Sequence, residues 1–112
     1  MATILIVDDK EMIRDSLALA LSRAGHKAVT TEDPTQAPDL IRQQRPACVI
    51  TDLKMPKMDG IELLARIRAE QPDVPVILMT AFATVSTAVQ AMRQGAYDYV
   101  QKPFESEEIL VL

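Results

Sequence analysis

Short apolar runs alternate along the chain with longer stretches in which apolar residues are spaced as in helices. Residues 4–7 (Ile-Leu-Ile-Val) form a continuous apolar run, as expected for a strand that is covered on both faces. Ile13, Leu17 and Leu21 then recur at helical spacing. Gly25 provides a natural end for that helix. The same alternation continues through the rest of the chain.

The pattern predicts strands at 4–7, 27–31, 47–52, 74–80 and 97–101. The predicted helices lie at 10–24, 33–44, 60–70 and 84–94, and a last one begins near 107. Asp59, with Glu62 three residues later, can cap the helix at 60–70. Val89 and Met92 belong to the apolar positions of the helix at 84–94.

Strands that alternate with helices form a parallel sheet through right-handed crossovers, with helices on both faces. The first, third and fourth strands are the most apolar, so they are expected at the centre of the sheet. This arrangement predicts a doubly wound, three-layer α/β/α domain of the flavodoxin-like type, with five strands in the order 2-1-3-4-5.

Composition and charge restrict the class of protein. The chain has 112 residues, of which 48% are apolar and 25% charged, as is ordinary for one soluble globular domain. A formal net charge of −4 argues against nonspecific binding to nucleic acid. No apolar run in the sequence approaches the length of a membrane span, which is roughly 20 residues, and the N-terminus does not resemble a signal peptide. A single cysteine excludes an internal disulfide. We therefore expect a cytoplasmic domain that contacts neither nucleic acid nor membrane.

Polar residues stand where four of the predicted strands end. They are Asp8 and Asp9 after the first strand, Asp52 at the third, Thr80 at the fourth and Lys102 after the fifth. Neighbouring strands lie about 4.8 Å apart and their carboxyl ends meet at one edge, so these side chains are expected to converge. Two carboxylates about 5 Å apart repel each other by roughly 3 kcal/mol at an effective dielectric constant of 20. Such a cluster calls for a cation, and an all-oxygen ligand set favours Mg²⁺.

The same edge of the sheet suits the transfer of a phosphoryl group. Mg²⁺, a Lys ammonium and a Thr hydroxyl stabilise phosphoryl oxygens, and a carboxylate nucleophile such as Asp52 would form an aspartyl-phosphate. Each feature also has an ordinary explanation, since an Asp pair after a strand often caps a helix and Lys-Pro is a common turn. The joint occurrence of these residues at ordered strand ends favours the phosphoacceptor.

Four motifs of the chain resemble those of receiver domains from two-component response regulators. They are Ile-Leu-Ile-Val-Asp-Asp at 4–9, Asp-Leu-Lys-Met-Pro-Lys-Met-Asp-Gly at 52–60, Met-Thr-Ala at 79–81 and Lys-Pro-Phe at 102–104. The resemblance implies the CheY-like form of the fold and phosphorylation of Asp52 by a sensor histidine kinase. It also implies a signalling switch rather than an enzyme, because phosphotransfer and autodephosphorylation take place only at its own Asp52.

The resemblance implies roles for individual residues as well. The ligands of Mg²⁺ would be Asp8, Asp9, Asp52 and the backbone carbonyl of Lys54. Asp8 would act largely through a water. Thr80 and Lys102 would contact the phosphoryl oxygens, and Tyr99 occupies the position of the switch aromatic. On phosphorylation Thr80 would move inward and Tyr99 would rotate to a buried position, which changes the surface of the fourth helix, fifth strand and fifth helix. A separate hypothesis concerns Phe82, which either shields the phosphoryl group from water or only packs against its loop.

Residues 94–104 look especially like those of NtrC-like transcriptional activators. In these proteins the receiver controls an AAA+ ATPase that acts on alternative-sigma-factor RNA polymerase, followed by a helix-turn-helix DNA-binding domain. We expect residues 1–112 to be the receiver of a longer protein with its final helix truncated, because that helix has only the six residues 107–112. The resemblance further implies that the output domains follow this chain and that a homodimer could form through the fourth helix, fifth strand and fifth helix.

Two other classes of protein share part of this pattern. A phosphohydrolase of the haloacid-dehalogenase type also uses an Asp at a strand end with Mg²⁺, but it carries a second Asp two residues later, where this chain has Lys54. A flavin-binding module of the same topology needs a Ser/Thr/Gly phosphate loop after the first strand. This chain has Asp8 and Asp9 there, and both would repel the phosphate. The receiver is the favoured interpretation.

Overall fold

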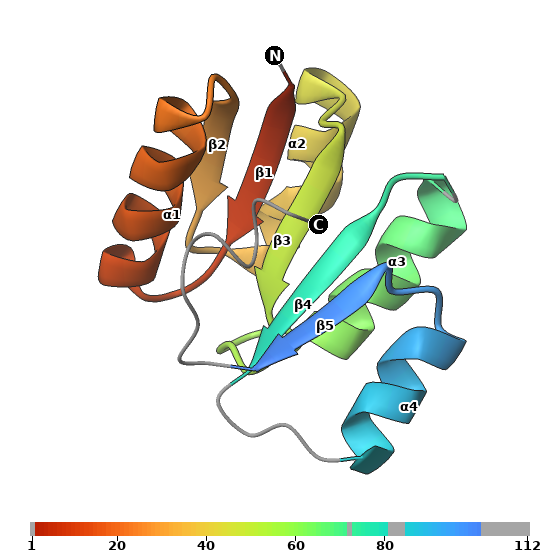
Figure 1. The fold of residues 1–112 in the computed structure, drawn as a ribbon. Coiled ribbons are helices and arrows are strands. Elements are labelled where there is room, and N and C mark those ends of the chain that lie inside the picture. Colours follow the sequence, from red (N-terminus) through yellow and green to blue (C-terminus); the bar gives the residue numbers. More distant parts are fainter. Residues whose placement is uncertain (1, 72, 81–84, 102–112) are drawn as a thin grey trace.

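The computed structural model describes residues 2–71, 73–80 and 85–101, which form one parallel sheet with helices packed on it (Figure 1). The strands are β1 (Thr3–Val7), β2 (Lys27–Thr31), β3 (Cys48–Asp52), β4 (Val76–Thr80) and β5 (Asp98–Gln101). The helices are α1 (Glu11–Arg23), α2 (Ala37–Gln44), α3 (Gly60–Glu70) and α4 (Val85–Arg93), with a short 3-10 helix, η1 (Pro34–Gln36), before α2. The strand order β2-β1-β3-β4-β5, with every neighbouring pair parallel, confirms the predicted topology.

The central strands are buried on both faces, which explains their continuous apolar sequence. Leu5 and Val7 of β1 belong to the same buried cluster as residues of α2, α3 and α4. Ile4 and Ile6 belong to a second cluster, which contains the buried residues of α1. Because side chains alternate across a strand, every second residue of β1 faces each cluster. The sheet is therefore the middle of three layers, and the predicted last helix from 107 lies outside the described residues.

The connection from β2 to α2 is the least regular part of the predicted pattern. η1 begins after Asp33, whose side chain accepts the backbone N–H of Thr35 at 2.9 Å. α2 follows with Pro38 in its first turn, where a missing N–H costs no intrahelical hydrogen bond. Its C-cap residue, Arg45, adopts the left-handed conformation with φ 46°. The single helix predicted from 33 to 44 is thus two helical segments.

The helix α3 begins and ends where the sequence predicts. Its first turn is capped by Asp59, which accepts the backbone N–H of Glu62 at 2.8 Å, and this bond confirms the predicted cap. Leu63 and Leu64 are fully buried, whereas Ile61 is only partly buried. The apolar face of α3 therefore packs on the sheet and fixes the helix beside the end of β3.

The helix α4 presents apolar side chains on its surface. Val89 is 42% exposed and Met92 49% exposed, although both belong to its helical apolar pattern. Ala91 is completely buried, as part of the cluster that also contains Ala96. The small side chain of Ala91 lets this short helix lie close to its neighbours, while Val89 and Met92 stay exposed.

Candidate functional site

Three carboxylates meet where β1 and β3 end. Asp52 is the last residue of β3, Asp8 and Asp9 directly follow β1, and these strands pair with Val7 opposite Thr51. The structure places one carboxylate oxygen of each Asp within 4.8 Å of the other two. Asp8 and Asp52 are buried, and Asp9 is half-buried. The acidic residues that the sequence predicts at this edge of the sheet therefore do converge.

The connection from β1 to α1 holds Asp8 by its backbone and by its side chain. Its N–H donates to the carbonyl of Thr31 at 3.2 Å, and its carbonyl accepts Nη1 of Arg14 at 2.8 Å. Oδ1 of Asp8 accepts the N–H of Lys10 at 2.9 Å. These three bonds fix the turn on both sides, so the direction of the carboxylate is set by the protein itself.

Asp9 does not serve as the cap of α1. The N-cap residue is Lys10, and the helix has no side-chain hydrogen bond at that position. Oδ1 of Asp9 is buried and has no hydrogen-bond partner among the described residues. A buried carboxylate oxygen without a donor is unfavourable, and native proteins leave few of them. The ordinary explanation of this residue as a helix cap therefore fails, and a cation would supply the missing partner.

The loop from β3 to α3 is held tightly against the end of β3. The N–H of Leu53 donates to the carbonyl of Met79 at 2.8 Å, and the N–H of Gly60 donates to the carbonyl of Leu53 at 2.7 Å. Position 60 requires glycine, because a Cβ there would lie 2.5 Å from the backbone oxygen of Asp52. Lys54 is exposed in this loop, two residues after Asp52. The close approach of α3 thus shapes the backbone beside the carboxylates.

The donor set of this cluster fits a divalent cation of the Mg²⁺ type. Carboxylate oxygens are the hard ligands that Mg²⁺ prefers, and no softer donor is needed to hold it. Two unit charges 4.8 Å apart repel each other by about 3.5 kcal/mol at an effective dielectric constant of 20, and the cluster contains three such pairs. A divalent cation would remove this repulsion and satisfy the buried oxygen of Asp9.

The other predicted site residues lie at the same edge or outside the described part of the chain. Thr80 ends β4, which is the neighbour of β3, so its backbone stands beside the end of the strand that carries the central carboxylate. Tyr99 lies in β5. Lys102 and Phe82 fall outside the described residues, so their roles stay predictions.

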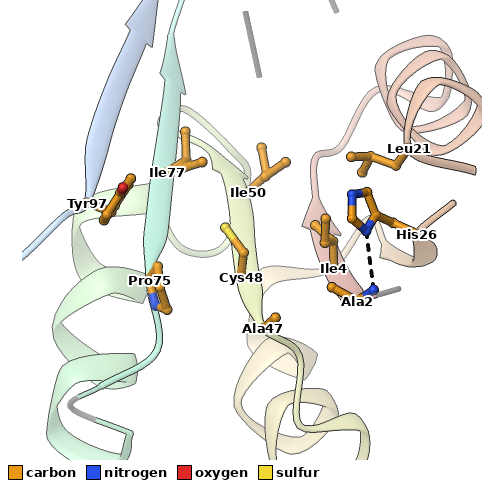
Figure 2. A pocket seen from close by; sticks show the side chains of 10 residues that line it. All are labelled: Ala2, Ile4, Leu21, His26, Ala47, Cys48, Ile50, Pro75, Ile77 and Tyr97. Carbon is orange, nitrogen blue, oxygen red and sulfur yellow. Dashed lines mark hydrogen bonds between the residues drawn. The ribbon is translucent and has the colours of Figure 1, made fainter. Parts of the chain in front are cut away.

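An apolar hollow lies at the opposite end of the sheet, with a volume of about 330 Å³ (Figure 2). Its wall includes Ala2, Ala47 and Pro75, each of which stands within one residue of the start of a strand. Two of its polar side chains are His26 and Cys48. Nδ1 of His26 accepts the N–H of Ala2 at 3.2 Å, and burial raises the pKa of the Cys48 thiol to about 11. The residues that line this hollow include no carboxylate, so it differs in chemistry from the acidic cluster.

Three residues around the cluster were missed by the sequence analysis. Arg14 donates to the carbonyl of Asp8, and Lys57 pairs with Asp33 across the two loops. A basic residue in the first turns after a strand-end carboxylate is a signal that could have pointed to Arg14. Asp33 and Lys57 are 24 positions apart in the sequence and carry no local signal of their contact.

The fold and the site define a flavodoxin-like α/β domain with an acidic cluster at the carboxyl ends of its strands. The family described as the response regulator receiver domain matches residues 4–112. The chain belongs to this family, and the resemblance inferred from its four motifs is confirmed.

The relatives agree with the predicted subfamily. The chain is 42% identical over 111 residues to the response regulator protein FleR of Pseudomonas aeruginosa, covering 99% of this chain and 24% of that protein. It is 41% identical over 107 residues to the DNA-binding transcriptional regulator NtrC of Klebsiella pneumoniae, covering 96% of this chain and 23% of that protein. The chain therefore spans about a quarter of the length of these curated relatives, and its likeness to NtrC-type regulators is confirmed.

A solved structure shares the fold over nearly the whole chain. The beryllofluoride-activated NtrC4 receiver domain dimer superimposes with a TM-score of 0.92 at 34% identity, covering 97% of this chain and 90% of that one. Within the part of our chain that the structure describes, none of the helices combines the length and apolar character needed to cross a membrane.

Proposed function

We propose that this chain is a phosphoacceptor switch, in which Asp52 takes a phosphoryl group from the phosphohistidine of a sensor histidine kinase. The observation that supports the proposal most strongly is the convergence of the Asp8, Asp9 and Asp52 carboxylates within 4.8 Å. The buried Oδ1 of Asp9, which lacks a hydrogen-bond partner in the described part of the chain, supports it further. Membership of the receiver family supports it independently.

The proposed step exchanges a P–N bond for a P–O bond. An oxygen of the Asp52 carboxylate attacks the phosphorus, the bond from phosphorus to the imidazole nitrogen breaks, and the imidazole keeps the electron pair and takes a proton from solvent. The ligands that would hold Mg²⁺ are Asp8, Asp9, Asp52 and the backbone carbonyl of Lys54. Bound Mg²⁺ supplies positive charge that offsets the repulsion between the carboxylates and the incoming phosphoryl oxygens.

Residues of the chain would complete the site after transfer. The Thr80 hydroxyl and the Lys102 ammonium would donate to the phosphoryl oxygens, and Phe82 would limit the access of water to the acyl phosphate. Water eventually hydrolyses the acyl phosphate and restores the Asp52 carboxylate. Because the phosphoryl group ends on the protein itself, the chain acts as a signalling domain and not as a turnover enzyme.

The readout would be the surface formed by α4, β5 and the helix predicted after 107. Thr80 would move toward the phosphoryl group and Tyr99 would follow it inward. The exposed apolar side chains of Val89 and Met92 could be buried in a protein contact at this surface. The partners we propose are a second copy of the chain, as in the NtrC4 receiver dimer, and an output region of the AAA+ and DNA-binding type in the cytoplasm.

Intact mass measurement tests the proposed reaction. The chain is incubated with acetyl phosphate with and without Mg²⁺, beside the variants Asp52→Asn and Asp15→Asn. Asp15 is an exposed residue of α1 outside the cluster, so its variant controls for the loss of one carboxylate. We expect one phosphoryl group, dependent on Mg²⁺, on the wild type and Asp15→Asn but not on Asp52→Asn. Phosphorylation that persists in Asp52→Asn, or none on folded wild type, would contradict the proposal.

A further inference from the structure

An ion pair joins the two loops beside the carboxylate cluster. Nζ of Lys57, in the loop from β3 to α3, lies 3.2 Å from Oδ2 of Asp33, in the connection from β2 to η1. The Lys57 side chain is 64% exposed and that of Asp33 only 20% exposed. The pair therefore joins a mostly buried carboxylate to a largely exposed lysine.

The Asp33 end of the pair is fixed by four hydrogen bonds. Oδ1 of Asp33 accepts both the backbone N–H of Thr35 at 2.9 Å and its hydroxyl at 2.7 Å. The backbone N–H of Asp33 donates to Oγ1 of Thr31 at 3.1 Å, and that hydroxyl donates in turn to the backbone carbonyl of Asp33 at 3.3 Å. The bonds from Thr35, and then Lys57, hold the pKa of Asp33 below its usual range, so the carboxylate is charged at neutral pH. Oδ2 is left to face Lys57.

The same connection is hydrogen-bonded to the turn after β1, which carries Asp8 and Asp9. The carbonyl of Thr31 accepts the N–H of Asp8 at 3.2 Å, so the end of β2 and the turn after β1 are one hydrogen-bonded unit. A continuous series of bonds therefore runs from Asp8 through Thr31 and Asp33 to Lys57. Since Lys57 lies in the loop that follows Asp52, the series links the ends of both strands that carry the carboxylates.

The backbone at Lys57, the other end of the ion pair, has an uncommon conformation. Lys57 has φ 71°, in the left-handed region that non-glycine residues seldom adopt. The next residue, Met58, is buried in the core with 4% exposure, which anchors the inner side of the loop. The ion pair to Asp33 is the anchor on the outer side. Between these anchors and the strand lies Lys54, whose backbone carbonyl is the one proposed ligand that a loop movement would displace.

We propose that the Asp33–Lys57 pair is a clasp that positions the loop from β3 to α3 for cation binding. This inference rests on the proposed function, because it assigns Asp33 and Lys57 as positioning residues for the Mg²⁺ site. Neither residue is among the proposed ligands of the cation. Their effect is to keep the Lys54 carbonyl in place, so that less ordering is needed when the cation binds.

The sign of the effect separates a clasp from simple electrostatics. A lysine near an acidic cluster repels Mg²⁺, so removal of its charge alone would tighten Mg²⁺ binding. Loss of the clasp would instead weaken it. Exposed ion pairs contribute little, so we expect the dissociation constant for Mg²⁺ to rise about threefold to fivefold in Lys57→Gln.

The experiment is a calorimetric titration of the whole 112-residue chain with Mg²⁺, for wild type and matched variants. Asp33→Asn keeps an oxygen for Thr35 while removing the charge that Lys57 contacts. Lys57→Arg keeps the ion pair, and Lys27→Gln removes one positive charge at the exposed start of β2. Urea denaturation in EDTA, run on every variant, reports whether the fold itself has changed.

We expect weaker Mg²⁺ binding in Lys57→Gln and in Asp33→Asn, with no further loss in the double variant, because the two changes break one contact. Lys57→Arg should bind as wild type, and so should Lys27→Gln. Equal or tighter binding by Lys57→Gln, or losses that add in the double variant, would overturn the clasp. A folded wild type that binds no Mg²⁺ would overturn the proposed function itself, and the clasp with it.

Discussion

Replacement of Asp9 by Asn should stabilise the protein when divalent cations are absent. Asp9 takes part in two of the three carboxylate pairs, whose oxygens lie within 4.8 Å of one another. Each pair repels by about 0.9 kcal/mol in bulk water and about 3.5 kcal/mol at an effective dielectric constant of 20. Asp9 is half-buried, so its pairs fall between these limits. Because Asp9→Asn removes two pairs, we expect it to raise the free energy of unfolding by about 2 kcal/mol in EDTA, near the lower of these limits.

At saturating Mg²⁺ the wild type should instead be more stable than Asp9→Asn. A ligand that binds only the folded state adds about 2.7 kcal/mol to the free energy of unfolding at one hundred times its dissociation constant. The wild type should gain this stabilisation in full, while Asp9→Asn should gain much less because a charged ligand has been lost. Urea denaturation followed by far-ultraviolet circular dichroism, in EDTA and at saturating Mg²⁺, measures both effects.

The control for this prediction is Asp15→Asn, which removes the same charge from an exposed position of α1. We expect its free energy of unfolding to stay within about 0.5 kcal/mol of the wild type under both conditions. If Asp9→Asn is no more stable than wild type in EDTA, the carboxylates do not repel each other as their spacing requires. The reasoning that leads from the cluster to a cation site would then be refuted.

Three further predictions concern separate parts of the chain. Gly60→Ala should lower the free energy of unfolding by about 1–3 kcal/mol in urea denaturation, because its Cβ would lie 2.5 Å from the backbone oxygen of Asp52. A variant as stable as the wild type would contradict this prediction and show that α3 can move away at no cost. Burial raises the pKa of Cys48 to about 11, so its thiol should react slowly with Ellman's reagent at pH 8. Because the thiolate is the nucleophile, the rate should rise about tenfold for each pH unit from pH 8 toward that pKa. Rapid reaction of the folded protein at pH 8 would contradict the burial of this thiol. Phe82→Ala should speed the decay of the phosphorylated mass after the donor is removed, and an unchanged decay rate would eliminate the shielding hypothesis.

The topology could be predicted from the sequence because its physical cause is local. The continuous apolar run at 4–7 requires cover on both faces, and the alternation with helices then requires a parallel sheet. Once the strand order is known, Asp8 and Asp52 must stand at one edge. The acidic cluster therefore follows from the positions of a few residues relative to the ends of strands.

The faces of the helices were less predictable. Helical spacing places Val89 and Met92 on an apolar stripe, but it does not say which side of the stripe contacts the sheet. In the structure the small Ala91 is buried, whereas the larger Val89 and Met92 are exposed. The buried face of a helix is decided by packing against distant parts of the chain, so it cannot be predicted from the sequence of that helix alone.

The contacts that support the site were also beyond the sequence pattern. Arg14 reaches back to the carbonyl of Asp8, and Lys57 reaches Asp33 across 24 positions. A long side chain can take many directions, so its partner depends on how two loops are placed in space. The ion pair between Lys57 and Asp33 therefore depends on where the loop from β3 to α3 lies relative to the connection after β2, which the sequence pattern does not specify.

The most direct test of the account is to locate the phosphoryl group by chemical trapping. Borohydride reduces an acyl phosphate to an alcohol, so a phosphorylated aspartate becomes homoserine and can be found by peptide mass spectrometry. After treatment with acetyl phosphate and Mg²⁺, we predict homoserine at position 52 and at neither Asp8 nor Asp9. Homoserine at another carboxylate, or its absence from a chain that has gained the phosphoryl mass, would contradict the assignment of Asp52 as the phosphoacceptor.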